Sequence, residues 1–391
     1  MFLLLASFLV LSPTLQGLRL AQFFQDGMVL QRAPEKATIY GFEEFVPGTF
    51  AALSCSLKGQ SLPLQHGLPV ESGPTAEGDW LVELDPQEAG TLCDIQIVGG
   101  EQEELSLKNV IFGDVWVCSG QSNMVFTMNG IFNKTEEIAA AAVYTDIRMA
   151  VIKRVTSDVE QADVETSTTW ADPSNARALG GFSAVCFFYA MNIYDELGVP
   201  LGLIDSAWGG TRVEAWSNHD ALDSCDIEDS PQNSNSYMWN AMIHPLTKMT
   251  VKGFLWYQGE ANANWNMDKY SCTFPALINS WRMEFSRMSN TSPNAPFGFV
   301  MLSTNKYGSA GTTYPRLRLH QTAGHGFVPN IDMPNTFMAT ALDTYDEENG
   351  IHPRYKKIVG ERLAYSGLAI AYGMYNFPFN GPMSYELAVS K

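Results

Sequence analysis

Ser122 follows an apolar run, residues 110–118, that ends abruptly in small and polar residues. Such a run bounded by turn-forming residues predicts a buried strand that opens into a loop. Gly120 permits a positive φ, so the chain can bend sharply there. The hydroxyl of Ser122 would then be exposed where the strand gives way to a helix, beside backbone N–H groups. These are the requirements of a serine nucleophile with a built-in oxyanion donor, although an ordinary polar turn has the same residue types.

A serine hydroxyl is a poor nucleophile at neutral pH and needs a base within hydrogen-bond reach. The rival nucleophile, Ser119, precedes the bend and is expected to lie nearer the strand. Histidines that compete for the role of the base are His66, His219, His244, His320, His325 and His352. For His244, which precedes a proline, a structural role in the core is favoured.

Strand-like and helix-like stretches alternate from residue 110 onward. Strand-like runs occupy residues 147–152, 199–204, 253–257, 297–302 and 336–342, and helix-like stretches occupy residues 138–143, 183–194, 267–285 and 353–372. This alternation predicts a three-layer α/β domain with a mostly parallel sheet. Ligands bind beyond the carboxyl ends of the strands in such sheets, and most polar motifs of the chain follow a strand-like run. These motifs are therefore expected to converge at one edge of the sheet.

The first quarter of the chain has a different pattern. Short apolar or alternating runs at residues 49–57, 80–84 and 93–98 are separated by Gly, Pro and acidic clusters, which predicts a small β-rich region that packs against the main domain or shapes a cleft. The expected organisation is a signal peptide at residues 1–17, a β-rich region at 18–108 and an α/β domain at 109–391.

The chain has 391 residues and a formal net charge of -18. This charge argues against nucleic acid as a partner, because phosphate binding needs a surplus of Lys and Arg. It suits an acidic compartment, where protonation of carboxylates relieves self-repulsion. The apolar residues 2–11 have the length of a secretory leader and are too short to span a bilayer. No later segment is long and apolar enough to do so, and the expected location is secreted or lysosomal.

The cysteines and sequons agree with a secretory route. Six cysteines are present, and some are expected to form disulfides with a pairing that the sequence leaves open. Asn133 and Asn290 begin glycosylation sequons. The chain contains neither a Cys-x-x-Cys pair nor a His-x-x-x-His motif, so no metal is expected. The pair Gly209–Gly210 lacks the residues of a nucleotide-binding loop, and no cofactor is expected.

Four stretches of the chain resemble the sequence blocks of the SGNH hydrolases, most closely their sialate O-acetylesterase branch. They are residues 113–124, 206–216, 256–260 and 351–354, in the family's order and spacing. The resemblance extends over roughly residues 24 to 375 and implies the SGNH-hydrolase-like α/β fold. Ser122 matches the family nucleophile. His352 matches the family base, and a proline after it would fix the loop that aims the ring.

The resemblance also implies the oxyanion donors, which are the N–H of Ser122, the N–H of Gly210 and the side chain of Gln258. Gln258 stands where many family members carry Asn, and its amide can donate the same bond. For Gln258 the alternative is a buried amide that satisfies backbone groups. For Gly210 the alternative is an ordinary tight turn.

The third member of the triad is where the chain departs from the family pattern. Many SGNH hydrolases place Asp three residues before the catalytic histidine, where this chain has Asn349. Asp343 is the preferred replacement, because it ends a strand-like run. Glu260 is another orienting carboxylate to consider, and a Ser122–His352 dyad oriented by backbone carbonyls is equally admissible.

The resemblance implies a serine esterase that removes O-acetyl groups from sialic acids, at the 9-O and also the 4-O position, through an acetyl-enzyme. The expected partner is therefore an O-acetylated sialic acid or sialoglycoconjugate. A sialic acid carries a carboxylate, which needs local positive charge from an otherwise acidic protein. Arg212, Arg318 and Arg354 are the candidates for this contact.

Two other functions are compatible with the sequence. One is an esterase that acts on a different acetylated carbohydrate such as acetylxylan. The other is a non-catalytic glycan-binding relative, which is favoured by Asn349 and by an end at Lys391, before the β-rich C-terminal portion of typical family members.

Overall fold

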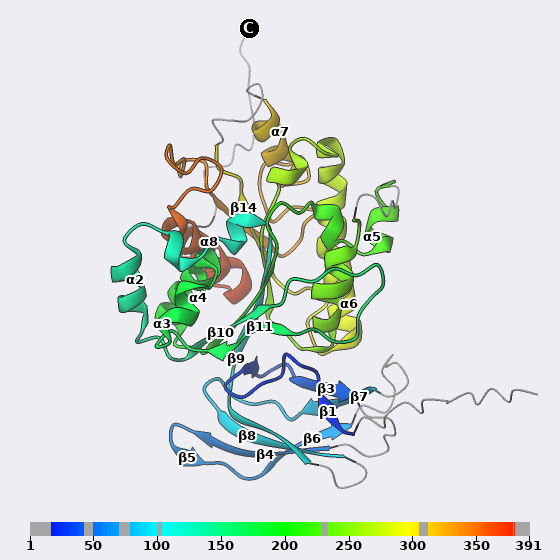
Figure 1. Ribbon diagram of the computed structural model, residues 1–391, viewed down its shortest axis with the longest axis vertical. Helices are drawn as coiled ribbons and strands as arrows, with labels where there is room; N and C mark the ends of the chain where they lie inside the picture. Colours follow the sequence, from blue (N-terminus) through cyan, green and yellow to red (C-terminus); the bar gives the residue numbers. More distant parts are fainter. Residues whose placement is uncertain are drawn as a thin grey trace, which may run out of the picture.

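The computed structural model describes residues 17–42, 50–69, 79–99, 104–227, 234–304, 312–377 and 379. All but the last residue of the predicted signal peptide lies outside these ranges. The described chain forms a mostly antiparallel β part and a larger α/β part, which share one continuous mixed sheet (Figure 1). Strand β9, Glu104–Gly120, runs through both parts and holds them together. The predicted boundary at residue 108 falls within this strand.

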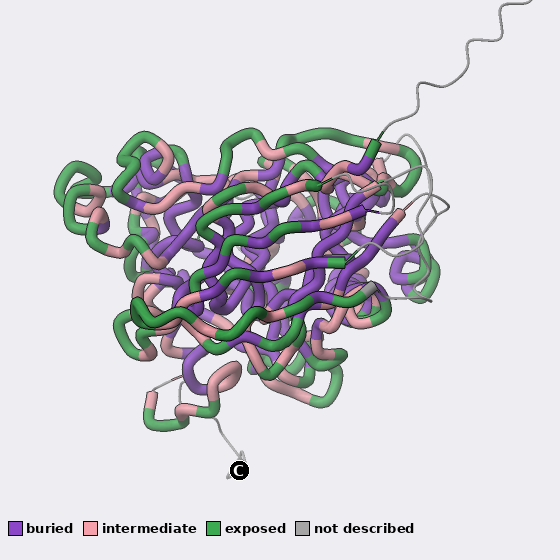
Figure 2. The backbone as a smooth tube through the Cα atoms, turned by 90° about the horizontal axis from the view of Figure 1, so that it is seen from below, coloured by how far each residue is buried: buried purple, intermediate pink, exposed green. Residues whose placement is uncertain are grey.

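The β part contains short strands that pair in the order β1-β3-β7-β6-β4-β8-β9, with β2 and β5 at the side. Their alternating exposed and buried residues are visible in Figure 2, which looks onto this end of the molecule. The strands are β1 (Arg19–Leu20), β2 (Val29–Gln31), β3 (Thr38–Phe42), β4 (Phe50–Leu57), β5 (Gln60–Ser61), β6 (Gln65–Pro69), β7 (Asp79–Leu84) and β8 (Leu92–Val98).

The α/β part has the strand order β11-β10-β12-β9-β13-β14-β15. All neighbours in this order are parallel except β10 and β11. Apart from the edge strand β11, which is mostly exposed and polar, these strands are largely buried and apolar, as expected for strands covered by helices on both faces. Their bounds are β10 (Ile147–Ile152), β11 (Thr166–Ala171), β12 (Leu201–Ala207), β13 (Gly253–Tyr257), β14 (Phe297–Met301) and β15 (Thr336–Thr340).

Helices cover both faces of these strands (Figure 1). On one face Tyr189 of α4 packs against Trp116 of β9, and on the other face Trp281 of α6 packs against Phe254 of β13. The helices are α1 (Ser122–Val125), α2 (Lys134–Ala141), α3 (Ala176–Gly180), α4 (Ala184–Leu197), α5 (His219–Asp223), α6 (Tyr270–Met288), α7 (Thr313–His320) and α8 (Lys356–Tyr372).

Helix α4 shows how local sequence sets these elements. The hydroxyl of Ser183 accepts from the N–H of Cys186 and caps the start of the helix, and Gly198 ends it in a left-handed conformation. Between the caps lies an apolar run that packs closely against α8. A Cβ atom at Gly360 of α8 would lie 2.5 Å from the Cβ of Phe188, so this approach requires glycine.

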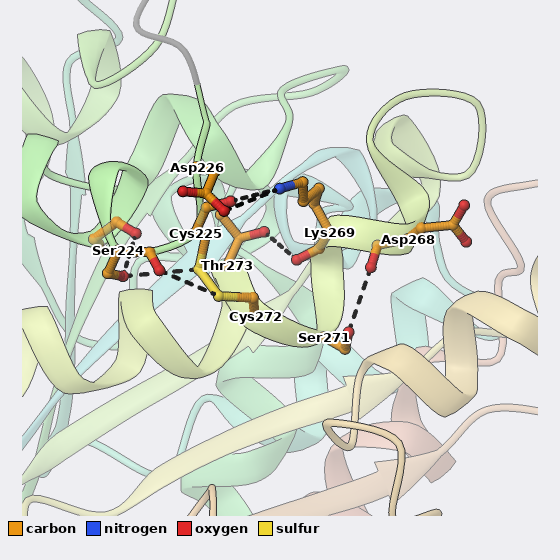
Figure 3. The surroundings of a disulfide bond; sticks show 9 residues. Ser224, Cys225, Asp226, Asp268, Lys269, Ser271, Cys272 and Thr273 are labelled. Carbon is orange, nitrogen blue, oxygen red and sulfur yellow. Dashed lines mark hydrogen bonds and ion pairs between the residues drawn. A yellow bond between two sulfur atoms is a disulfide. The ribbon is translucent and has the colours of Figure 1, made fainter.

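Three disulfides join elements that are distant in sequence. Cys55 and Cys93 link the paired strands β4 and β8, and Cys118 of β9 is bonded to Cys186 of α4. Cys225, which follows α5, is bonded to Cys272 in α6 (Figure 3). The expectation that some cysteines pair is confirmed, and Cys118 lies in the core.

The predicted α/β class is confirmed, and the strands expected at residues 147–152 and 253–257 have the observed bounds. A mostly parallel sheet is not confirmed for the sheet as a whole, which is mixed because β9 continues into the antiparallel strands. Within the described residues no helix has both the length and the apolar character needed to cross a membrane.

Candidate active site

Three neighbouring strands end at the same edge of the sheet. β9 lies between β12 and β13, and its last residue, Gly120, is in register with Ala207 and Tyr257. The segments that follow these strands carry Ser122, the Gly209–Gly210 pair and residues 258–260. The predicted convergence of the polar motifs follows directly from this parallel register.

The bend after β9 depends on Gly120. Its φ is +131°, and a Cβ atom there would lie 2.3 Å from the carbonyl oxygen of Tyr257. The next residue, Gln121, donates its N–H to the same carbonyl at 3.0 Å. This bend turns the chain so that Ser122 opens α1 and is partly exposed, whereas Ser119 is sealed within the strand. The structure therefore separates the two serines as the sequence predicted.

Ser122 and His352 meet in the folded chain, although they are far apart in sequence. The Oγ of Ser122 lies 2.8 Å from the Nε2 of His352, within hydrogen-bond reach. Both side chains are half-buried. A neutral imidazole with its proton on Nδ1 accepts the serine hydroxyl proton at Nε2, which is the arrangement of a nucleophile and its base.

The loop that carries His352 is held by its own side chains. Asn349 donates its amide to the carbonyl of His352 and accepts the N–H of His352 at its own carbonyl, 3.2 Å away. Arg354 donates to Asp346 from Nε at 2.6 Å and from Nη2 at 2.9 Å, and hydrogen bonding to Arg354 lowers the pKa of Asp346 to about 2. These contacts fix the backbone on both sides of the imidazole.

The assignment of Asp343 as the third triad member is corrected by the structure. Both oxygens of Asp343 accept from Arg362 of α8, at 2.6 and 2.7 Å, instead of facing His352. A guanidinium offers this carboxylate a two-point partner that an imidazole cannot match. Glu260 is engaged elsewhere as well, because its Oε1 accepts from the amide of Asn123. The described contacts therefore show a dyad.

The surroundings of His352 favour its neutral form. Burial, and then the charge of Lys356, lower the pKa of the imidazole below its ordinary value of 6.5. Lys356 is itself fully buried at the start of α8, and burial lowers its pKa to about 7. The imidazole consequently stays able to accept a proton in mildly acidic solution.

Two backbone donors remain for an oxyanion. Ser122 is the first residue of α1, so its N–H has no partner within the helix. Gly210 has a φ of +77°, and no hydrogen bond from its N–H occurs in the described part of the chain. The adjoining Gly209 lies against Ser122, since a Cβ atom on that glycine would be 3.4 Å from the serine Cβ. These donors flank the nucleophile.

The predicted third donor, Gln258, is corrected. Its Nε2 donates to the carbonyl of Thr211 at 3.1 Å and to Oδ1 of Asn262 at 2.8 Å, and its Oε1 accepts from Tyr270 at 2.9 Å. Both amide hydrogens are used and the side chain is fully buried. Gln258 therefore supports the loop that carries Gly210 and does not contact an oxyanion.

The three arginines predicted to bind substrate have different surroundings. Arg212 stacks on the ring of Trp265 at 4.3 Å, two residues after Gly210 in the oxyanion loop. Arg318 donates to the carbonyl of Ser303 at 3.5 Å. Arg354 binds Asp346 and also Glu348, at 2.7 Å, so its charge is already matched by two carboxylates. The structure thus makes Arg354 a support of the histidine loop.

Sequence reasoning missed three buried polar side chains beside the dyad. Gln121 accepts from the N–H groups of Gly259 and Ala261 through its Oε1, at 3.4 and 3.1 Å. Asn123, which follows Ser122, accepts a hydrogen bond from Lys356. Their positions within or beside the first and fourth sequence blocks are the signal that could have identified them.

Other polar groups have structural roles. The Nδ1 of His244 lies 2.9 Å from the carbonyl of Gln161 and its Nε2 lies 3.3 Å from Glu160, so the expected structural role of this histidine is confirmed. Among the described residues, no group of three or more His, Cys, Asp or Glu side chains is placed to hold a metal ion.

A family model described as carbohydrate esterase, sialic acid-specific acetylesterase, matches residues 112–368, well over half of the chain. The chain belongs to this family. Ser122 and His352 both lie within the matched residues, so the hydrogen-bonded dyad belongs to the part of the chain that the family model matches.

Similar proteins in this family have names that specify the substrate. The chain is 41% identical to the sialate O-acetylesterase of Homo sapiens, over 94% of this chain and 73% of that protein. It is 37% identical to the sialate O-acetylesterase of Mus musculus, over 94% of this chain and 76% of that protein. The crystal structure of a carbohydrate acetylesterase from Xanthomonas citri superimposes with a TM-score of 0.74 and 30% identity, over 91% of this chain and 75% of that one.

Proposed function

We propose that this protein is a serine esterase that hydrolyses the O-acetyl groups of sialic acids. The contact of 2.8 Å between Ser122 Oγ and His352 Nε2, at the strand edge where ligands bind in such sheets, carries this proposal. The names of the similar proteins, sialate O-acetylesterases of human and mouse, support the choice of substrate.

The geometry supports acyl transfer in two steps. Ser122 Oγ attacks the acetyl carbonyl carbon while His352 Nε2 takes the hydroxyl proton, and the N–H groups of Ser122 and Gly210 stabilise the oxyanion. Collapse of this intermediate breaks the ester C–O bond, and His352 returns the proton to the departing sugar hydroxyl. Water then attacks the acetyl-enzyme with His352 again as the base, which releases acetate and restores the serine.

The hydrogen-bonded dyad favours an esterase over a non-catalytic glycan-binding protein, because a lectin needs no activated serine. Acetate release should be measured with 9-O-acetylated sialic acid, 4-O-acetylated sialic acid and acetylxylan, alongside covalent labelling by an organophosphonate. We expect the organophosphonate to label the protein, and we expect acetate to be released faster from the sialic acid esters than from acetylxylan. A labelled protein that releases acetate faster from acetylxylan would support the alternative esterase. A protein that is not labelled and releases no acetate would support a glycan-binding protein.

We propose Arg212 as the partner of the sialic acid carboxylate, because its guanidinium lies on Trp265 beside the oxyanion loop. Arg318 remains a second candidate. Changing Arg212 to alanine is expected to raise KM for 9-O-acetylated sialic acid about 10- to 100-fold, the value of one charge-assisted hydrogen bond.

The same change should leave KM for 4-nitrophenyl acetate unchanged, since this ester has no carboxylate. Arg177, an exposed arginine on α3, offers a matched alanine control. An equal rise of KM for both esters in the Arg212 variant would contradict a carboxylate contact.

The protein is proposed to be secreted or lysosomal. Three disulfides agree with an oxidising compartment. The absence of a nucleic-acid partner remains a prediction that depends on the net charge of -18.

Of the two sequons, Asn133 is proposed as the glycosylated one. Asn133 is exposed where α2 begins. The side chain of Asn290 donates to Glu83 at 2.7 Å, and the following Thr291 is 2% exposed. A glycan on Asn290 would remove that hydrogen bond, so mass spectrometry of the secreted protein should find occupancy at Asn133 and little at Asn290. The reverse occupancy would contradict this prediction.

Asp205 is a buried carboxyl whose contribution to stability is more favourable in acidic than in neutral solution. It is buried in β12, and its Oδ1 has no hydrogen-bond partner among the residues that the structure describes; burial, which outweighs the attraction of Arg154, raises its pKa from 3.8 to about 7. The folded chain therefore binds a proton between these values that the unfolded chain releases. Ionisation of this carboxyl costs no stability below pH 3.8, and it destabilises the fold progressively as the pH rises to 7.

Changing Asp205 to asparagine is expected to raise the free energy of unfolding at pH 7.5 by about 2 to 4 kcal/mol and to have little effect at pH 4. Urea unfolding at both pH values measures this difference. Asp223, an exposed aspartate of α5, provides the matched control. An equal effect of the Asp205 change at both pH values would show that the charge is not the cause.

A further inference from the structure

Asn123, the residue that follows the nucleophile in the chain, is buried and has several hydrogen-bond partners. Its side chain is 1% exposed. Its Nδ2 donates to Oε1 of Glu260 and, at 2.9 Å, to the carbonyl of Ile351, and its Oδ1 accepts from Nζ of Lys356. The hydrogen bonds of one amide group are thus directed to the histidine loop, to the start of α8 and to the turn after β13.

The place of these contacts in the chain gives them a consequence for the dyad. Asn123 is covalently joined to Ser122, and Ile351 is covalently joined to His352. The hydrogen bond between the Asn123 amide and the Ile351 carbonyl therefore ties the serine turn to the histidine loop one residue away from each reacting group. A shift of this contact would change the distance between Ser122 Oγ and His352 Nε2.

We propose that Asn123 is a positioning residue for the Ser122–His352 dyad, held in its working orientation by Glu260 and Lys356. The proposal rests on the proposed esterase function. In the described structure neither Glu260 nor Lys356 is hydrogen-bonded to Ser122 or His352. Both hold the Asn123 amide, and Lys356 also acts on His352 through its charge.

An amide is the side chain that can join these partners. It donates to the carboxylate and to the backbone carbonyl while it accepts from the ammonium group. Aspartate at this position could not donate, and leucine could neither donate nor accept. Because a buried polar group without a partner is costly, the three-way bonding also selects one amide orientation over the flipped one.

Glu260 and Lys356, the two ionisable partners of Asn123, are both buried. Nζ of Lys356 lies 4.9 Å from the ring centre of Phe126 and 5.1 Å from that of Tyr257. The groups whose charges act on Lys356 are Glu260 and Asp346, and Lys356 in turn acts on His352. Glu260 is also buried, and in the described structure its Oε2 has no hydrogen-bond partner. The amide of Asn123 is thus the bridge between a buried anion and a buried cation.

The test compares variants by the rate constant for inactivation with an organophosphonate and by kcat and KM for 4-nitrophenyl acetate, both as functions of pH. Asn123→Leu and Glu260→Leu remove hydrogen bonds on the two sides of the bridge. Glu260→Gln retains an oxygen that can accept from Asn123. Asn240→Leu is the control, because Asn240 is equally buried but bonds to the carbonyl of Ser157.

Asn123→Leu is expected to lower the inactivation rate constant and kcat about 10- to 100-fold with KM unchanged, as small misplacements of reacting groups do. Glu260→Leu should act in the same direction, and Glu260→Gln should recover most of the lost rate. The control should lose thermal stability without a change in either rate. Wild-type rates in Asn123→Leu or, if that variant does not fold, in Glu260→Leu would overturn the proposal, as would an equal loss in Asn240→Leu.

A second measurement separates this proposal from the proposed function. The ¹⁵N chemical shift and titration of the His352 ring, assigned with His352→Gln, report the contact with Ser122 without any turnover. A wild-type protein that neither releases acetate nor reacts with the probe would refute the esterase. The positioning role would then be supported by a changed His352 signal in Asn123→Leu but not in Asn240→Leu, and an unchanged signal would refute it.

Discussion

Changing Ser122 to alanine or His352 to glutamine is expected to lower kcat for acetyl ester hydrolysis about 10⁴-fold or more, because each change removes one half of the nucleophile–base pair. The double variant should be little slower than either single variant, since the two side chains act as one unit. Acetate release from 9-O-acetylated sialic acid measures the effect. A matched control is His325→Gln, which alters a histidine hydrogen-bonded to Asp332 at 2.7 Å.

The dyad also predicts the pH dependence of the reaction. The base must be neutral, and burial together with the Lys356 charge lowers the pKa of His352 below 6.5. The acidic limb of kcat/KM is therefore expected below pH 6.5, which leaves the enzyme active in mildly acidic solution. Two results with the variants would contradict the proposed mechanism: full activity of Ser122→Ala or of His352→Gln, or losses of activity that add up in the double variant.

Changing Gly120 to alanine is expected to destabilise the fold by about 3 to 5 kcal/mol, through a backbone clash combined with a disfavoured φ. A Cβ atom at this position would lie 2.3 Å from the carbonyl oxygen of Tyr257, and β13 cannot retreat because it is paired with β9 and β14. Chemical unfolding and the yield of folded protein measure the loss. The nucleophile turn should be displaced in whatever fraction folds.

A second glycine separates the two causes. Gly198 has a φ of +62°, and among the described residues, its chain neighbours aside, a Cβ atom at this position would meet nothing within 4 Å. Gly198→Ala therefore carries only the left-handed backbone cost of about 1 to 2 kcal/mol. The excess loss in Gly120→Ala measures the clash with Tyr257. Equal losses in the two variants would show that close packing at the strand end is not what requires glycine.

Much of the site could be predicted from local patterns. The apolar run before Ser122 predicted a strand that ends at the nucleophile, and the alternation of strands and helices predicted that the polar motifs would meet at one sheet edge. These inferences succeeded because strand periodicity and turn residues act over a few neighbouring positions. The pairing of Ser122 with His352 needed more, namely the resemblance of four sequence blocks to a known family.

The sequence by itself determined the α/β class, the strand that presents Ser122, and a chemistry of serine and histidine. Only the tertiary structure decided the partners of buried polar groups. The side chain of Gln258 is hydrogen-bonded to Thr211, Asn262 and Tyr270, and the carboxylate of Asp343 accepts from Arg362. A buried donor or acceptor must find a partner, and that partner comes from segments that only folding brings near. The same reason explains why the role of Asn123, whose partners lie more than a hundred residues away, could not be found by reading along the chain.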